Sequence, residues 1–438
     1  MIKKIYTFTM GIVICIELVG CATYQPQVLP LAANIVSPTK MYSIDERKNS
    51  NTKSLSIIAY EAALYNPDLR AMRQELNISD ALVLGARLLP DPSVGLSIAA
   101  PLGGEGLYNA LGAGIGWSLG ALFTRSNEVN RAQIERNVTI ASYDWQVRLN
   151  VANALVLAGR LKSLQEQREI ALNNLDLSQR LSEVTAQKAL LFDETMSISN
   201  SRKMMMLDAL DIQAKINDQI AFTQYELNYQ LGLLPSEIVK IAPFDLDEID
   251  PDPKALFKQA VEKRNDIVAR QYAYQSSDVF YQRNLLAQFP SFALTLNWSS
   301  DTSKIKTFGP SVTFDLPLWN RNQGGVALSK ALRDKEKESY SAALERAYSD
   351  IFSLSDALKR NQTLYTKAKR EITMNQKLID ALKKALNKGD ITLIDYTIKM
   401  NEINTKELWM IGLMQSIFEQ RIALSLASGS NTILGEFK

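Results

Sequence analysis

Two stretches of the chain alternate between apolar and polar residues. Over 291–299 every second side chain is large and apolar, from Phe292 to Trp298, and the positions between them are polar or small; the alternation resumes over 309–317. A period of two predicts β-strands with one polar and one apolar face. At roughly 10 residues, each strand is long enough to cross a bilayer as a tilted strand of a β-barrel. For this stretch alone, a half-buried soluble hairpin is the alternative.

The same pattern occurs earlier in the chain, which predicts strands over 93–102 and 110–119. The residues that lead into the strands also correspond, with Asn-Pro-Asp-Leu at 66–69 and Arg-Asn-Asp-Ile at 264–267. Internal duplication of this length indicates two copies of one structural unit. We therefore expect a tandem repeat.

Two long segments, 102–234 and 318–438, contain no proline. Both segments are rich in good helix formers, so we expect long helices over about 126–231 and 324–428. Seven-residue spacing of apolar side chains favours antiparallel coiled-coil packing of these helices.

Each long segment is interrupted once, at 187–193 and at 388–395. Gly389 can end a helix in the left-handed conformation, and Asp390 or Thr392 can cap the next helix. The sequence therefore predicts, in each repeat, a helical hairpin whose turn lies far from the strands.

The N-terminus has the features of a secretory signal: two lysines, an apolar run, and Leu-Val-Gly-Cys ending at Cys21. This ending resembles the bacterial lipoprotein signal, which implies cleavage before Cys21 and lipidation of that cysteine. The next residue, Ala22, resembles the outer-membrane sorting choice. An ordinary signal peptide with an incidental cysteine is the alternative.

These patterns divide the chain into six segments. They are a signal peptide (1–20), a lipidated arm (21–52), repeat one (53–234), a linker (235–253), repeat two (254–430) and a C-terminal tail (431–438).

Composition narrows the possible chemistry. The 438 residues carry a net charge of +2, which gives no electrostatic reason to expect a nucleic acid partner. Histidine is absent and both cysteines lie in the first 21 residues, which makes zinc sites and Ser-His or Cys-His catalysis improbable. No phosphate-binding or dinucleotide-binding glycine pattern occurs in the right context. We therefore predict no catalytic residues, no metal site, no cofactor and no enzymatic activity.

Three features of the chain together resemble one known family over nearly the whole length. They are the duplicated order of strand pair and long hairpin, the elbow Leu-Pro-Leu-Trp-Asn-Arg-Asn-Gln-Gly-Gly at 316–325, and the turn from Gly389 to Asp395. It resembles the outer-membrane efflux protein family, the TolC-like channels. The elbow looks like that of the heavy-metal branch. The family implies a mainly α protein whose homotrimer forms a 12-stranded transmembrane β-barrel on a periplasmic α-barrel.

Strand number supports the trimer. Four strands cannot close a barrel, since about 8 is the smallest usual number, and their free edges must pair with other copies. Three copies would supply about 12 strands.

The resemblance also implies site residues. The periplasmic tip or gate would comprise Asp193, Gly389, Asp390 and Asp395. Aspartates at a constriction suit a gate that attracts cations; helix capping alone is the alternative. The elbows between barrel and helices would comprise Arg125, Pro317, Asn320, Arg321, Asn322, Gly324 and Gly325.

The resemblance therefore implies the lipid-anchored outer-membrane exit duct of a resistance-nodulation-division tripartite pump, extending into the periplasm. Its partners would be further copies of the chain, a periplasmic adaptor, an inner-membrane pump and outer-membrane lipid, and its cargo drugs or heavy-metal ions. Two alternatives stay open: the exit duct of a type I protein secretion system, and a non-conducting coiled-coil scaffold lipoprotein.

Overall fold

The computed structural model describes residues 52–104, 107–191, 193–244 and 247–430, together with Tyr24, Pro26, Gln27 and Leu29, and leaves out the side chains of 372–377. The predicted signal peptide, Cys21 and the tail at 431–438 lie outside the described residues. The chain divides into two compact units, 1–36 and 37–438. All helices and strands given below belong to the second unit.

One structural unit occurs twice along the chain. In the first copy, α3 (Pro67–Arg87) leads into the strands β2 (Ser93–Ala99) and β3 (Ala110–Ser118) and then into the helical hairpin α4 (Leu119–Leu190) and α5 (Met196–Leu231). In the second, α7 (Asn265–Leu286) leads into β5 (Phe292–Ser300) and β6 (Lys306–Phe314) and then into α8 (Gln323–Lys388) and α9 (Leu393–Ala427). The predicted fold class, long helical hairpins joined to strand pairs in tandem, is confirmed.

Shorter elements accompany each copy. The helices α2 (Leu55–Tyr65) and α6 (Pro253–Lys263) precede α3 and α7. A parallel pair of two-residue strands, β1 (Thr52–Lys53) and β4 (Lys240–Ile241), joins the residues just before α2 to the segment between the repeats.

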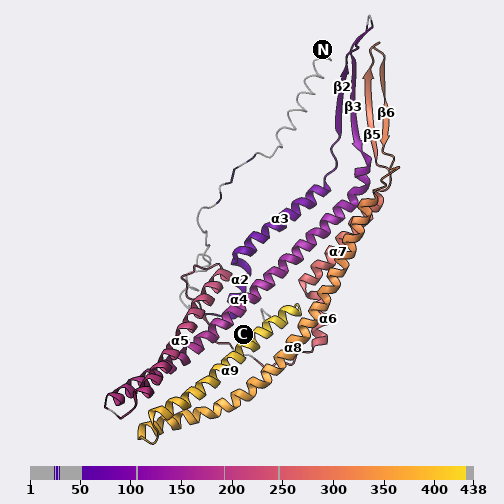
Figure 1. Cartoon of the computed structure of the whole chain (residues 1–438). Coiled ribbons are helices and arrows are strands. Elements are labelled where there is room, and N and C mark those ends of the chain that lie inside the picture. Colours follow the sequence, from indigo (N-terminus) through magenta and orange to yellow (C-terminus); the bar gives the residue numbers. More distant parts are fainter. Residues whose placement is uncertain are drawn as a thin grey trace, which may run out of the picture. The chain divides into compact units, whose positions relative to one another are not determined.

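The long strands form one antiparallel sheet in the order β2-β3-β5-β6 (Figure 1). The two repeats meet at β3 and β5, where Ile115 pairs with Leu296. The strands β2 and β6 are the outer strands, so one edge of each is unpaired among the described residues. Pro310 lies in β6, where its missing amide can face the free edge.

Several element boundaries differ from those expected. β2 ends at Ala99 rather than near 102, and β6 ends at Phe314 rather than near 317. α4 begins at Leu119, directly after β3, whereas the sequence suggested a start near Ser126. No proline interrupts the residues between, so the strand can pass into the helix without a loop. β6 begins at Lys306 because a short turn pairs this residue with Ser300.

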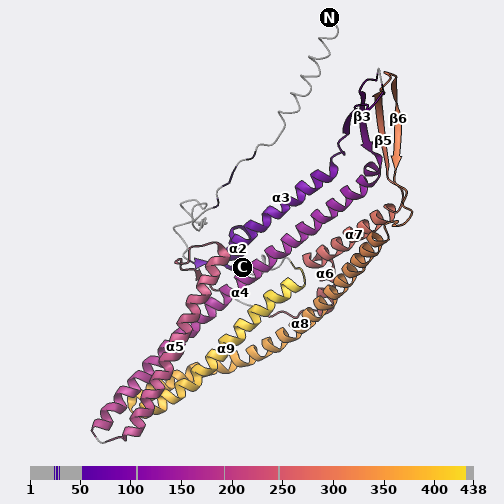
Figure 2. The same cartoon turned by 45° about the horizontal axis from the view of Figure 1, so that its top comes forward.

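The strands lie at one end of the second unit, and the α4–α5 and α8–α9 turns lie at the other (Figures 1 and 2). α4 packs on α3 and α5 along one side, and α7 and α9 lie between α4 and α8. With 72 and 66 residues, α4 and α8 run almost from the sheet to the turns.

The main core lies near the middle of α4, where α2 and the C-terminal parts of α5 and α9 pack against it. Its largest fully buried side chain is Phe418 of α9, whose ring lies against Gly159 of α4 and 4.7 Å from the ring of Phe244. A Cβ atom at Gly159 would overlap the Phe418 ring. Because α4 and α9 belong to different repeats, this contact joins the two copies.

A buried ion pair fixes β1 to α2. The Lys53 ammonium donates to both carboxylate oxygens of Glu61, at 2.6 and 2.5 Å, and Glu61 is only 1% exposed. Burial raises the pKa of Glu61 above its ordinary value, and Lys53 offsets part of this rise. The amide of Ala242 also donates to the Lys53 carbonyl at 2.9 Å.

Candidate functional site

The sheet has one polar face. Directly paired residues point to the same side, and the register pairs Gly95 with Gly114, Gly114 with Asn297, and Asn297 with Gly309. We call this surface the polar face. Its members are Ser93, Gly95, Ser97, Gly112, Gly114, Gly116, Thr295, Asn297, Ser299, Thr307, Gly309 and Ser311.

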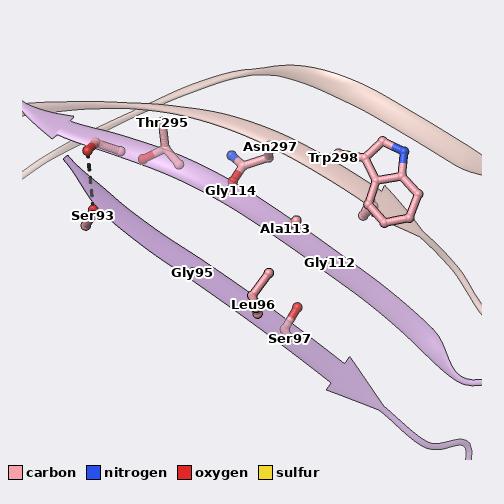
Figure 3. Close-up of a pocket in the computed structure, with 12 residues that line it drawn as sticks. Ser93, Gly95, Leu96, Ser97, Gly112, Ala113, Gly114, Thr295, Asn297 and Trp298 are labelled. Atoms are coloured by element: carbon pink, nitrogen blue, oxygen red, sulfur yellow. Dashed lines mark hydrogen bonds between the residues drawn. The ribbon is translucent and has the colours of Figure 1, made fainter. Parts of the chain in front are cut away.

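Hydroxyl and amide groups on the polar face bind one another across the strands. The Asn297 side-chain amide donates to Ser311 Oγ at 2.7 Å, and the hydroxyls of Ser299 and Thr307 are 2.7 Å apart. A shallow hollow of about 480 Å³ lies on the sheet, lined mostly by this face (Figure 3). The surface is hydrophilic and carries no formal charge.

The opposite face is apolar and exposed. Its large apolar side chains are Val94, Leu96, Ile98, Leu111, Ile115, Trp117, Phe292, Leu294, Leu296, Trp298, Phe308, Val312 and Phe314, and Lys306 lies at its edge beside Ser300. Leu96 is 80% exposed and Phe308 is 70% exposed. The register therefore confirms the alternation expected from the sequence. An exposed apolar surface of this extent marks contact with a membrane or with another protein.

At the far end of repeat two, Gly389 ends α8 in the left-handed conformation, with φ of +79°. Its amide donates to the Leu386 carbonyl at 3.0 Å. Thr392 then caps α9: its hydroxyl accepts from the Asp395 amide at 3.1 Å and donates to the Asp395 carboxylate at 2.7 Å. The Thr392 amide also donates to the Asp395 carboxylate at 3.4 Å, which completes a capping box, and Asp390 is exposed beside it.

The turn of repeat one has no glycine. α4 ends at Leu190, and the amide of Asp193 donates to the Lys188 carbonyl at 2.9 Å. Thr195, rather than Asp193, caps α5 by accepting from the Ile198 amide at 3.4 Å. Both turns lie at the same end of the helices, and the four residues expected at the tip (Asp193, Gly389, Asp390 and Asp395) are all exposed.

The elbow of repeat two is a loop that is fixed to α7. Asn322 has a φ of +51°, and its side-chain amide donates to the Asn284 carbonyl at 2.9 Å and to Asn284 Oδ1 at 3.2 Å. A Cβ atom at Gly325 would lie 2.7 Å from Asn284 Oδ1, so glycine permits this close approach. Arg321 also has a positive φ, of 43°.

The other elbow residues have different settings. Pro317 and Asn320 lie in the loop before α8, and a Cβ atom at Gly324 would meet nothing within 4 Å. Arg125 is not part of a loop: it lies inside α4, and its guanidinium donates to the backbone carbonyl of Arg87 at the end of α3. In repeat one the strand and helix are continuous, so no elbow forms there.

Sequence reasoning missed Asn284. An asparagine inside a helix is a weak signal, because it is a poor helix former whose side chain often binds nearby backbone. Among the described residues, no group of three or more acidic or cysteine side chains could hold a metal ion. None of the helices in the described ranges combines the length and the apolar character needed to cross a membrane.

No protein-family model and no curated protein matches the chain. Solved structures do match. The CmeC outer membrane channel of Campylobacter jejuni has a TM-score of 0.73 at 14% identity, over 93% of this chain and 94% of that one. CusC, whose structures concern folding and transmembrane channel formation, has a TM-score of 0.69 at 16% identity, over 94% and 100%. The open state of the MtrE outer membrane channel of Neisseria gonorrhoeae has a TM-score of 0.60 at 16% identity, over 86% and 89%. The chain therefore has the fold of the TolC-like outer-membrane channels.

Proposed function

We propose that the chain is the outer-membrane exit duct of a tripartite efflux pump, through which small toxic solutes leave the periplasm passively. The observation that carries this proposal is the separation of the two sheet faces by the register. A lipid-matched apolar surface backed by an uncharged hydrophilic one suits a wall between a bilayer and a water-filled passage. A coiled-coil scaffold has no need of such a wall.

Closure of the wall requires further copies of the chain. The sheet has four strands, and in the part of the chain that the structure describes the outer strands β2 and β6 each offer an unpaired edge. Pairing β6 of one copy with β2 of the next satisfies both edges, and three copies give about 12 strands, enough for a closed barrel. We therefore propose a homotrimer, anchored in the outer membrane and further tethered by a lipid on Cys21.

The two helix turns are the proposed periplasmic gate. Asp193, Asp390 and Asp395 place exposed carboxylates on the turns, at the end of the helices far from the sheet. In a trimer these residues would form rings of negative charge, which attract cations and repel one another. Docking of a periplasmic adaptor and an inner-membrane pump would open them, since the chain shows no energy-coupling motif of its own.

Single-channel recording in planar bilayers tests the duct. Gly95 lies on the polar face, and a Cβ atom there would meet nothing within 4 Å. Gly95→Asp should therefore fold and place one carboxylate per copy in the passage, shifting the reversal potential towards cation selectivity; Gly95→Lys should shift it towards anions.

The matched control is Gly85→Asp on α3, where a Cβ atom also meets nothing within 4 Å. It adds the same charge outside the sheet and should leave selectivity unchanged. Absence of any pore from the purified wild-type trimer would overturn the duct and favour the scaffold. Equal selectivity in all variants would show that the polar face does not line the passage.

The cargo is a separate question, because the polar face carries only generic hydroxyl, amide and glycine positions. We propose heavy-metal ions or drugs. A deletion strain, with and without plasmid complementation, should be exposed to copper, silver, zinc and cobalt salts and to dyes, detergents and antibiotics. Sensitivity to the metals alone would assign a heavy-metal pump, and sensitivity to the organic compounds a multidrug pump.

A further inference from the structure

A hollow of about 540 Å³ lies beside the middle of α4, away from the sheet and from both helix turns. Its volume falls within the range of small-molecule sites, about 300–1,000 Å³. We call it the mid-helix hollow. Residues of three helices line it, among them Arg160, Leu164 and Gln167 of α4, Asp218 and Phe222 of α5, and Gln415 of α9.

The hollow lies on the side of α4 that faces away from α2. α4 packs against both α5 and α9, and because residues of both flanking helices line the hollow, it lies on the concave side of the three. Ala59 and Tyr60 of α2 instead face Val147 and Val151 of α4 across a different hollow. Arg160 follows Val151 by about two and a half helical turns, so it points away from α2. In a closed ring of copies, this concave side is the inner one.

The charges at the mid-helix hollow do not balance. The Arg160 guanidinium lies 3.6 Å from the Glu419 carboxylate, which also accepts from the Gln415 side-chain amide at 2.9 Å. Asp218 is exposed and, within the described ranges, forms no hydrogen bond or ion pair. One guanidinium therefore accompanies two carboxylates, and the Asp218 carboxylate is left to face solvent in the hollow.

An apolar surface lies beside this carboxylate. Phe222 is 62% exposed and follows Asp218 by about one helical turn on α5, and Leu164 lines the hollow from α4. The face of an aromatic ring attracts a cation, as an ionised carboxylate does. The hollow therefore suits a ligand that has a positive charge and a large apolar body.

We propose that the mid-helix hollow binds amphipathic organic cations as they pass along the helical part of the duct. This inference rests on the proposed function, which defines the inner side of the ring, and it favours drugs over heavy-metal ions as the cargo. Phe222 and Leu164 would contact the apolar body of the ligand, and Asp218 would face its charge. Glu419 would offset the charge of Arg160, which otherwise repels a cation.

Equilibrium dialysis of the purified full chain in detergent, with detergent alone as the blank, tests binding without requiring a pore. The probes are tetraphenylphosphonium, a cation that carries phenyl rings, and the neutral triphenylphosphine oxide. We expect the cation to bind about fivefold more tightly than the neutral compound. Asp218→Asn and Phe222→Leu should each weaken binding of the cation about threefold, whereas Arg160→Gln should strengthen it by about the same factor.

The matched control is Asp208→Asn, which removes the same charge from an exposed position of α5 outside the hollow and should leave binding unchanged. Absence of tetraphenylphosphonium binding, equal binding of the two probes, or a change of the same sign in Asp218→Asn and Arg160→Gln would overturn the cation site.

Single-channel recording separates this inference from the duct itself. Tetraphenylphosphonium should lower the conductance of the wild-type pore and should affect Asp218→Asn less. Binding without any effect on conductance would place the hollow outside the passage, which would overturn the inference and leave the duct standing. Absence of any pore would instead contradict the proposed function.

Discussion

Replacing Lys53 should destabilise the folded state, because the buried Glu61 carboxylate would lose its counter-charge. In the structure both oxygens of Glu61 accept from the Lys53 ammonium, and the Glu61 side chain is 2% exposed. Lys53→Met keeps most of the aliphatic stem but leaves the carboxylate without its counter-charge. Removing one partner of a buried pair costs about 3–5 kcal/mol. Because the Lys53 side chain is 21% exposed and water can approach it, we expect about 3 kcal/mol, the low end.

Hydrogen exchange measures this loss locally. A loss of about 3 kcal/mol makes opening of α2 about a hundredfold more frequent, so amides of residues 55–65 should exchange about a hundredfold faster after correction for intrinsic rates. Amides of α8, far from the pair in sequence, serve as the internal control. Glu61→Gln in the Lys53→Met background removes the buried charge and should recover much of the protection at neutral pH.

The pH dependence follows from the direction of the Glu61 pKa. Burial raises it in the folded state, Glu237 adds to the rise, and Lys53 offsets part of it. Because the pKa of Glu61 is higher in the folded than in the unfolded state, protonation of Glu61 favours the folded state. This contribution to the free energy of unfolding is complete below the pKa of the unfolded state, about 4.3, and is lost as pH rises through the pKa of the folded state. Without Lys53 the folded pKa rises further, so the deficit of Lys53→Met should be full at pH 7.5 and smaller at pH 5. An equal deficit at both values, or exchange within threefold of wild type at pH 7.5, would refute this account.

Two further comparisons use pairs of residues in similar settings. Gly232→Ala should destabilise the fold strongly, because φ is +66° and the new Cβ would lie 2.5 Å from the Tyr65 carbonyl oxygen. Gly389→Ala has a φ of +79° but no atom within 4 Å of the new Cβ, so it should lower the free energy of unfolding by only about 1–2 kcal/mol. Thermal unfolding of the two variants should rank them in that order, and equal midpoints would contradict the steric argument. Asp193→Ala and Asp395→Ala should both raise basal single-channel conductance if the turns form the gate. If conductance stays at the wild-type value in both variants, the turns are not the gate. Asp395→Ala should then only speed amide exchange at the start of α9, by the roughly 1 kcal/mol of a lost cap.

Patterns of period two and the absence of proline were enough to predict the sheet and the long helices. The strand alternation was strong because the sheet has one apolar and one polar face, so every second residue from Phe292 to Trp298 is apolar. The continuous passage from β3 into α4 could not be read in this way. Leu-Gly-Ala-Leu-Phe suits a strand end, a loop or a first helical turn equally well, and only packing decides.

Contacts between distant residues were also beyond the sequence pattern. Glu61 on a helix reads as a solvent-facing residue until β1 places Lys53 beside it. Asn284 and Asn322 lie 38 residues apart, and their hydrogen bonds depend on how the loop returns to α7. At the turn of repeat two, Asp390 and Thr392 were equal candidates to cap α9, and the backbone geometry selected Thr392.

The continuity of β3 with α4 makes the two repeats mechanically unlike. At about 1.5 Å per residue, the 72 residues of α4 form a rod roughly 108 Å long, built onto a strand with no joint between them. Bending it near the sheet means breaking helical hydrogen bonds. α8 instead starts after a short loop, whose backbone torsions can change without that loss. A rotation of a helical hairpin relative to the sheet therefore costs less free energy in repeat two than in repeat one. The loop before α8 would act as the hinge, while α4 stays fixed to the sheet.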